Sequence, residues 1–214
     1  NLSSLASRVN TSAALIPLIP VHWLHPINWD ELEFFRATKW IAEGRVPYRD
    51  FWEHHTPLAW ILFAPFTTDA TGADAVIAMR WAQIPVWIAT FVLVNLWMRG
   101  AGIARGARWA AMALALCSSL FMLPAIEYRV ESVGCLLFVL GLVLAQRKQD
   151  WAAGIVFCLA GFANLRLGPV LVVAVLLHFR PRIIAGGVAA LAACLGAFRA
   201  LGSWDELCQH VWRD

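Results

Sequence analysis

Seven apolar stretches, each free of Asp, Glu, Lys and Arg, follow one another along this chain. A helix of roughly 20 apolar residues spans the hydrocarbon core of a bilayer, and about 17 residues suffice. The first three stretches meet this length, whereas the last four must borrow flanking residues or be broken. The sequence therefore predicts helices over residues 9–29, 81–98, 109–126, 132–146, 151–165, 167–179 and 183–198.

The composition agrees with a membrane-embedded fold. Of the 214 residues, 60% are hydrophobic and only 14% are charged, whereas a soluble domain has about a quarter of its residues charged. We therefore expect an all-α, polytopic membrane protein surrounded by the lipid bilayer. The net charge of +3 is small and the sequence has no Lys/Arg-rich patch, so we expect no nucleic-acid partner.

The positive charges between the stretches predict the orientation of the chain. Residues 57–66 are apolar, but about ten residues cannot cross a bilayer, so we expect a helix at the interface. With about seven crossings, residues 26–78 form a periplasmic loop, the N-terminus is cytoplasmic, and residues 1–214 form one domain. The Arg/Lys groups that then fall on the cytoplasmic side are Arg8, Arg99, Arg105, Arg108, Arg147, Lys148, Arg180 and Arg182, as the positive-inside rule requires.

The loop after the first apolar stretch concentrates the ionisable groups of the chain and interleaves them with Trp and Phe. A membrane protein that gathers its charges in one aromatic-rich loop is expected to build a site at the membrane surface. Between Trp29 and Phe66, the charged and histidine residues are Asp30, Glu31, Glu33, Arg36, Lys39, Glu43, Arg45, Arg49, Asp50, Glu53, His54 and His55.

Residues 30–43 are predicted to form an amphipathic helix that Gly44 and Pro47 end. Asp30 lies at its start, on the same side as the apolar residues. One interpretation makes Asp30 the N-cap, with Glu33 as its capping-box partner. The other turns Asp30 toward a cleft. The two roles are compatible, because one carboxylate oxygen can cap while the other faces the cleft.

Residues 46–58 alternate charged and aromatic side chains without the period of a helix or a strand. Arg49 and Asp50 are expected either to form a local ion pair or to contribute Arg49 to a site. His54 and His55 are adjacent, so we expect only one of them to face a site. A metal-binding histidine pair is disfavoured, because helical ligands stand three or four residues apart.

The run D-E-x-E-F-x-x-A, followed by G-x-x-P-Y-R-D-F-W-E-H-H-T-P-L, resembles the first periplasmic loop of the GT-C glycosyltransferases. The resemblance is to bacterial members of the protein mannosyltransferase and lipid A aminoarabinose transferase superfamily. It continues more weakly through Arg80 and through residues 128–132 and 165–169. It covers most of this chain, but only the N-terminal half of a typical family member.

The resemblance implies an enzyme of the bacterial inner membrane that transfers a sugar from a polyprenyl-phosphate carrier to a periplasmic acceptor. The family's first acidic position falls on Asp30, as general base toward the acceptor hydroxyl. The second falls on Glu131, which would orient the acceptor or, with Asp30, hold a divalent metal cation as a cofactor.

The resemblance also implies residues that bind the substrate. The family's H-K-P-P-L becomes His54-His55-Thr56-Pro57-Leu58 here, so His55 replaces the lysine that contacts the carrier phosphate. Phosphate binding then depends on Arg49, Arg129 and Arg166. Glu31 and His54 complete the expected substrate-binding set.

Two alternatives remain open. Arg80 and Arg129 can instead be interfacial anchors with extended side chains, whereas Arg166 stands beside Gly168 and Pro169, a pattern typical of a broken helix at a cavity. The chain as a whole can be a non-catalytic accessory or structural subunit of a larger membrane complex, descended from the same family. If a carrier phosphate binds, Arg129 and Arg166 are expected to converge with Asp30 and Glu131.

Overall fold

The structure, a computed structural model, describes residues 24–67 and 71–212. Within these ranges every regular element is a helix, and only an isolated bridge pairs Pro47 with Phe51. The all-α class predicted from the apolar stretches is therefore confirmed.

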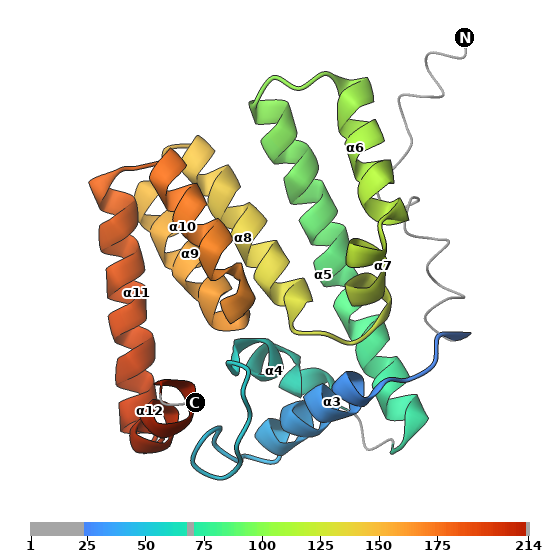
Figure 1. Cartoon of the computed structure of the whole chain (residues 1–214), viewed down its shortest axis with the longest axis vertical. Helices are drawn as coiled ribbons and strands as arrows, with labels where there is room; N and C mark the ends of the chain where they lie inside the picture. Colours follow the sequence, from blue (N-terminus) through green and yellow to red (C-terminus); the bar gives the residue numbers. More distant parts are fainter. Residues whose placement is uncertain (1–23, 68–70, 213–214) are drawn as a thin grey trace.

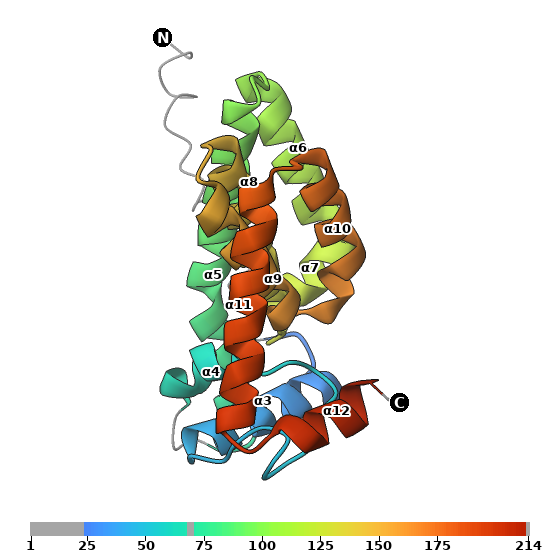
Figure 2. The ribbon, with the colours of Figure 1, turned by 90° about the vertical axis from the view of Figure 1, so that its left-hand side faces the viewer.

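The long helices run side by side, and the chain passes up and down among them (Figure 1). The remaining helices lie across one end of this bundle (Figures 1 and 2). The bundle contains α5 (Ala73–Gly100), α6 (Arg105–Cys117), α7 (Ser119–Ile126), α8 (Glu131–Gln146), α9 (Asp150–Ala163), α10 (Gly168–Leu177) and α11 (Pro181–Ala200). The layer at its end, which we call the end layer, contains α3 (Trp29–Ala42), α4 (Leu58–Phe63), η3 (Ala64–Phe66) and α12 (Trp204–Trp212).

The helix bounds follow the apolar stretches, with four differences. The helix predicted over residues 81–98 is α5, which begins at Ala73, inside the predicted loop, and therefore includes Arg80. The stretch 109–126 is broken into α6 and α7, because Ser118 adopts an extended conformation (φ −82°, ψ 130°). The stretch 167–179 is preceded by the 3₁₀ turn η4 (Leu165–Leu167). The polar tail also contains α12, which the apolar pattern did not predict. Most of the predicted helix over residues 9–29 lies outside the described residues.

Two of the described helices, α5 and α11, are long and apolar enough to cross a membrane. The segments Glu131–Gln146, Asp150–Ala163 and Leu165–Leu177 are apolar but shorter. By length and composition, α5 and α11 could therefore cross a membrane, and the number of about seven crossings stays a prediction.

The two ends of the bundle differ in charge. α5 ends, α8 ends and α11 begins at the end opposite the end layer (Figure 1). Arg99, Arg147 and Arg180 therefore lie at that far end, where Arg180 Nη1 is 2.6 Å from Asp150 Oδ1. The acidic and histidine-rich loop belongs to the end layer.

An apolar core joins the end layer to the bundle. Phe34, Trp60 and Phe63 from the end layer pack against Met79 of α5 and against Tyr128, and all five side chains are buried. The buried side of α3 carries Phe34 and Ala37, as the amphipathic pattern predicted. This core fixes the position of α3, and with it the polar groups at its start.

Candidate functional site

The start of α3 is set by Asn28 rather than by Asp30. The Asn28 side chain accepts a hydrogen bond from the Glu31 backbone N–H at 3.0 Å, and the Asn28 backbone N–H donates to Glu31 Oε2 at 3.3 Å. This is a capping box, but the predicted one, Asp30 with Glu33, was wrong. Because the helix begins at Trp29, its third position is Glu31. The Asp30 carboxylate is therefore free of the capping role.

Glu31 forms a buried ion pair with Arg80 of α5. The Arg80 Nε and Nη2 atoms donate to the two carboxylate oxygens at 2.7 and 2.6 Å, and neither side chain is exposed. The Tyr128 backbone N–H also donates to Glu31, at 2.8 Å. This geometry favours a structural role for Glu31, which joins three segments of the chain, over the predicted substrate contact.

Arg129 is the centre of an ionic cluster between α3 and the start of α8. Its Nη1 lies 3.2 Å from Asp30 Oδ2 and 2.9 Å from Glu127 Oε2, and its Nε lies 3.4 Å from Glu131 Oε2. Arg166 Nη1 is 3.6 Å from the other oxygen of Glu131. The four residues that were expected to converge thus lie together. We call Asp30, Glu127, Arg129, Glu131 and Arg166 the Arg129 cluster.

The members of the Arg129 cluster differ in exposure. The side chains of Asp30 and Arg166 are 51% and 70% exposed, whereas those of Arg129 and Glu131 are 17% and 16% exposed. The cluster therefore presents one carboxylate and one guanidinium to a ligand. Because Arg129 contacts both Asp30 and Glu131, a metal cation shared by these two carboxylates would have to compete with it.

Glu127 is a cluster member that the sequence analysis missed. Its carboxylate contacts Arg129 and lies 3.0 Å from His25 Nε2. Burial raises the pKa of Glu127, but hydrogen bonds from Arg129 and His25 outweigh that effect and hold the pKa below its usual value. For Arg129 the signs are reversed: burial lowers the pKa of the guanidinium, but the negative charges of Glu131 and Glu127 raise it above its ordinary value. In the sequence, the only sign that Glu127 belongs to this cluster is its position two residues before Arg129.

Both histidines of the loop lie against one carboxylate. Glu53 Oε1 is 2.8 Å from His54 Nδ1 and 3.2 Å from His55 Nδ1, and it accepts the His54 backbone N–H at 2.9 Å. Adjacent histidines were expected to point apart, with only one of them in a site, but the chain bends here and both rings contact the same carboxylate. The ring centroids are 3.9 Å apart. We call Glu33, Glu53, His54 and His55 the Glu53 cluster.

The carboxylates of the Glu53 cluster influence each other. Burial raises the pKa of Glu53, but the hydrogen bond from His55 and the charges of His54 and His55 bring it below its usual value. Burial and the negative charge of Glu53 raise the pKa of Glu33, whose carboxyl also hydrogen-bonds Glu53. Among the described residues, Glu53, His54 and His55 form a group whose ligand atoms could hold a metal ion.

Phe34 lies between the two clusters. The Arg129 guanidinium carbon is 5.9 Å from the centroid of its ring, and the His55 ring meets it edge-on with a centroid distance of 4.9 Å. Phe34 is buried. The clusters are therefore neighbours that an apolar side chain keeps apart.

Arg49 lies apart from both clusters and pairs with its neighbour. Its Nη2 is 2.8 Å from Asp50 Oδ2, and its Nη1 donates to the Leu201 carbonyl at 3.5 Å. The predicted local ion pair is thus present. The hydrogen bond from Arg49 lowers the pKa of Asp50 to about 2. Arg49 links the loop to the corner between α11 and α12.

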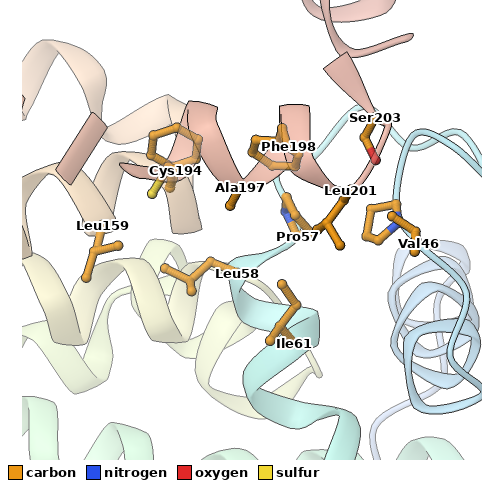
Figure 3. A pocket seen from close by; sticks show the side chains of 12 residues that line it. Val46, Pro57, Leu58, Ile61, Leu159, Cys194, Ala197, Phe198, Leu201 and Ser203 are labelled. Atoms are coloured by element: carbon orange, nitrogen blue, oxygen red, sulfur yellow. The ribbon is translucent and has the colours of Figure 1, made fainter. Parts of the chain in front are cut away.

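An apolar cavity of about 150 Å³ lies where the loop meets α9 and α11 (Figure 3). Leu58 and Ile61 face Phe198 across it, and Ser203 lies at its edge. The Ser203 hydroxyl is buried and has no hydrogen-bond partner among the described residues. A cavity of this size and lining admits a benzene-sized apolar group.

No protein-family model, curated protein or solved structure matches this chain. The chemistry of the site therefore has to be argued from its own groups. The exposed Asp30 carboxylate can accept a proton, the exposed Arg166 guanidinium can bind an anion, and Arg129 lowers the pKa of the neighbouring Glu127.

Proposed function

We propose that this chain is a membrane glycosyltransferase that moves a sugar from a polyprenyl-phosphate carrier to a periplasmic acceptor. The observation that carries the proposal is the ionic contact of Asp30, Arg129, Glu131 and Arg166 within one cluster. The resemblance of residues 29–66 to the GT-C loop adds the substrate class.

In the proposed reaction, Asp30 accepts the proton of the acceptor hydroxyl while the hydroxyl oxygen attacks the anomeric carbon of the sugar. The bond between that carbon and the phosphate oxygen breaks, its electron pair leaves with the carrier phosphate, and the anomeric centre is inverted. Arg166 stabilises the departing phosphate, because a guanidinium binds phosphate oxygens through paired N–H donors. Glu131 orients Arg129 and Arg166, which it contacts.

The proposal includes the orientation of the chain in the membrane. The end layer faces the periplasm of a bacterial inner membrane and the arginine-rich far end faces the cytoplasm. The up-and-down course from α5 to α11 would supply six of the about seven crossings that the sequence predicts. The carrier's hydrocarbon chain stays in the bilayer, except for a short apolar segment of it that the cavity beside the loop accepts.

The test compares Asp30→Asn with Asp74→Asn in membranes supplied with a polyprenyl-phosphate sugar. A positioned general base contributes roughly 10²–10⁴-fold to a rate, so Asp30→Asn should lower transfer by that factor at unchanged protein abundance. Asp74 is exposed at the start of α5, so its variant should transfer at the wild-type rate. Transfer by Asp30→Asn above about a tenth of the wild-type rate would exclude Asp30 as the base.

A second candidate function is that of a non-catalytic accessory subunit. The observation that favours it is the full set of partners around Arg129, whose guanidinium already contacts three carboxylates. If the wild-type chain transfers no carrier-linked sugar and is recovered from membranes with other subunits, this second function replaces the first.

A further inference from the structure

The Glu53 cluster combines two imidazoles and a buried carboxylate at metal-binding distances, and nothing in the proposed transfer reaction requires this arrangement. We propose that Glu53, His54 and His55 bind a divalent transition-metal ion, and that Zn²⁺ fits the site. The metal site stands on these side chains alone and does not depend on the glycosyltransferase proposal.

The spacing of the ligand atoms matches the requirement of a zinc ion. Zinc binds histidine nitrogen and carboxylate oxygen at about 2.0–2.2 Å, so two ligands of a tetrahedral site lie about 3.4 Å apart. Glu53 Oε1 is already 2.8 and 3.2 Å from the two Nδ1 atoms. All three ligand atoms lie within 4.8 Å of one another. An ion can therefore enter with small side-chain movements, in place of the protons that these atoms share.

The ligands are held in place before any ion binds. The Tyr48 hydroxyl donates to the His55 carbonyl at 2.7 Å, and the His55 ring packs edge-on against Phe34. The Glu53 side chain is only 3% exposed. Groups that surround the ligands and fix their orientation raise metal affinity, because less ordering is needed on binding.

Charge and access also favour a cation. Glu33 places a second carboxyl group against Glu53, so the neighbourhood of the two imidazoles is acidic. The His54 side chain is 51% exposed, which opens the site to solvent. Two histidines and one glutamate are the three-ligand set of several zinc sites that keep a fourth position for water or substrate. We assign the open position here to water or to an oxygen anion.

The test uses the full chain, purified in detergent through a tag without histidine and stripped with a chelator. A calorimetric titration with Zn²⁺ should show that one ion binds per chain. His54→Ala should weaken binding at least about tenfold. Because the His54 side chain is half-exposed, this substitution should affect metal binding more than it affects folding. His178→Ala is the matched control: His178 precedes α11, its Nδ1 lies 3.1 Å from the Ala174 carbonyl, and its loss should not change affinity.

Co²⁺ provides the second measurement. A tetrahedral site with nitrogen and oxygen ligands should give a visible absorption band that Glu53→Gln abolishes, with helix content checked by circular dichroism. Failure of the wild type to bind Zn²⁺ would overturn the proposal. Equal affinity of His54→Ala and wild type would also overturn it, because binding would then take place elsewhere on the chain.

Discussion

Adjacent carboxylates at the start of α3 have opposite environments. Glu31 is fully buried and paired with Arg80, whereas half of the Asp30 side chain is exposed beside Arg129. Burial of a charge is tolerated only when a partner and hydrogen bonds compensate for lost hydration. Glu31 has both, which allows its burial, whereas Asp30 keeps half of its side chain in contact with solvent.

Glu31→Gln should destabilise the protein strongly. The substitution keeps the side-chain shape but removes the negative charge opposite the buried Arg80 guanidinium, and breaking a buried pair costs about 3–5 kcal/mol. Unfolding by denaturant in detergent would measure the loss.

Glu43→Gln is the matched control for this experiment. The Glu43 carboxylate is exposed and lies 3.7 Å from Arg45, so its loss should cost less than about 0.5 kcal/mol. Equal stability of the two variants would show that the Glu31–Arg80 pair contributes no more than a surface pair.

Glu127 should make the protein sensitive to acid. Its pKa in the fold lies below the usual value of 4.5, so the folded state binds its proton less readily than the unfolded state does. The stability it provides is present at neutral pH and is lost as the pH falls from about 4.5 through the lower folded pKa. Melting temperatures of wild type and Glu127→Gln, compared over that range, should converge on acidification. A constant difference would contradict the depressed pKa.

At the scale of the helices, glycine permits a close contact between α9 and α11. A Cβ atom on Gly154 of α9 would collide with the Ile183 carbonyl oxygen of α11, and one on Gly186 would collide with the Trp151 carbonyl. The two helices therefore meet backbone to backbone, as small residues allow in membrane helix pairs. The contact holds α11, and with it the loop-facing cavity, in position.

Gly154→Ala should destabilise the bundle by about 1–3 kcal/mol, because overpacking forces backbones apart. Gly196→Ala, in α11, meets no atom within 4 Å and should be neutral or stabilising by up to about 1 kcal/mol, because alanine favours the helix. Thermal unfolding of both variants measures the difference. A neutral Gly154→Ala would mean that the helix pair can separate without cost.

On the scale of the whole molecule, the ionic clusters lie at one end of the bundle and a group of arginines lies at the other. The Arg129 and Glu53 clusters lie where the bundle meets the end layer, and Arg99, Arg147 and Arg180 lie at the far end. In a membrane such a distribution favours the arginine-rich end on the cytoplasmic side. Both proposed sites would then face the same compartment.

Cysteine labelling can test this orientation in a variant without native cysteines. Glu43 in the end layer and Arg147 at the far end are both exposed. An impermeant reagent applied to intact spheroplasts should label Glu43→Cys and should reach Arg147→Cys only after lysis. Labelling of both positions in intact spheroplasts would exclude the proposed orientation.

Local sequence pattern predicted much of the fold. Uncharged stretches identified α5, α8, α9, α10 and α11, because hydrophobic length and helical period depend on neighbouring residues. The ion pair of Arg49 with Asp50 was open to prediction for the same reason. Ser118 was not, because a single extended residue inside an apolar run leaves the hydrophobic pattern unchanged.

The clusters depended on contacts between distant residues. Glu31 meets Arg80 and Tyr128, Asp30 meets Arg129, and no local period relates these positions. The capping box is formed by Asn28 and Glu31, two residues earlier than the predicted Asp30 and Glu33, because α3 begins at Trp29. The sequence by itself determined an all-helical chain with its charges gathered in one loop. Only tertiary packing decided which carboxylate is buried, which is exposed, and which histidines share one glutamate, because burial and pairing depend on what the other helices bring to that end of the bundle.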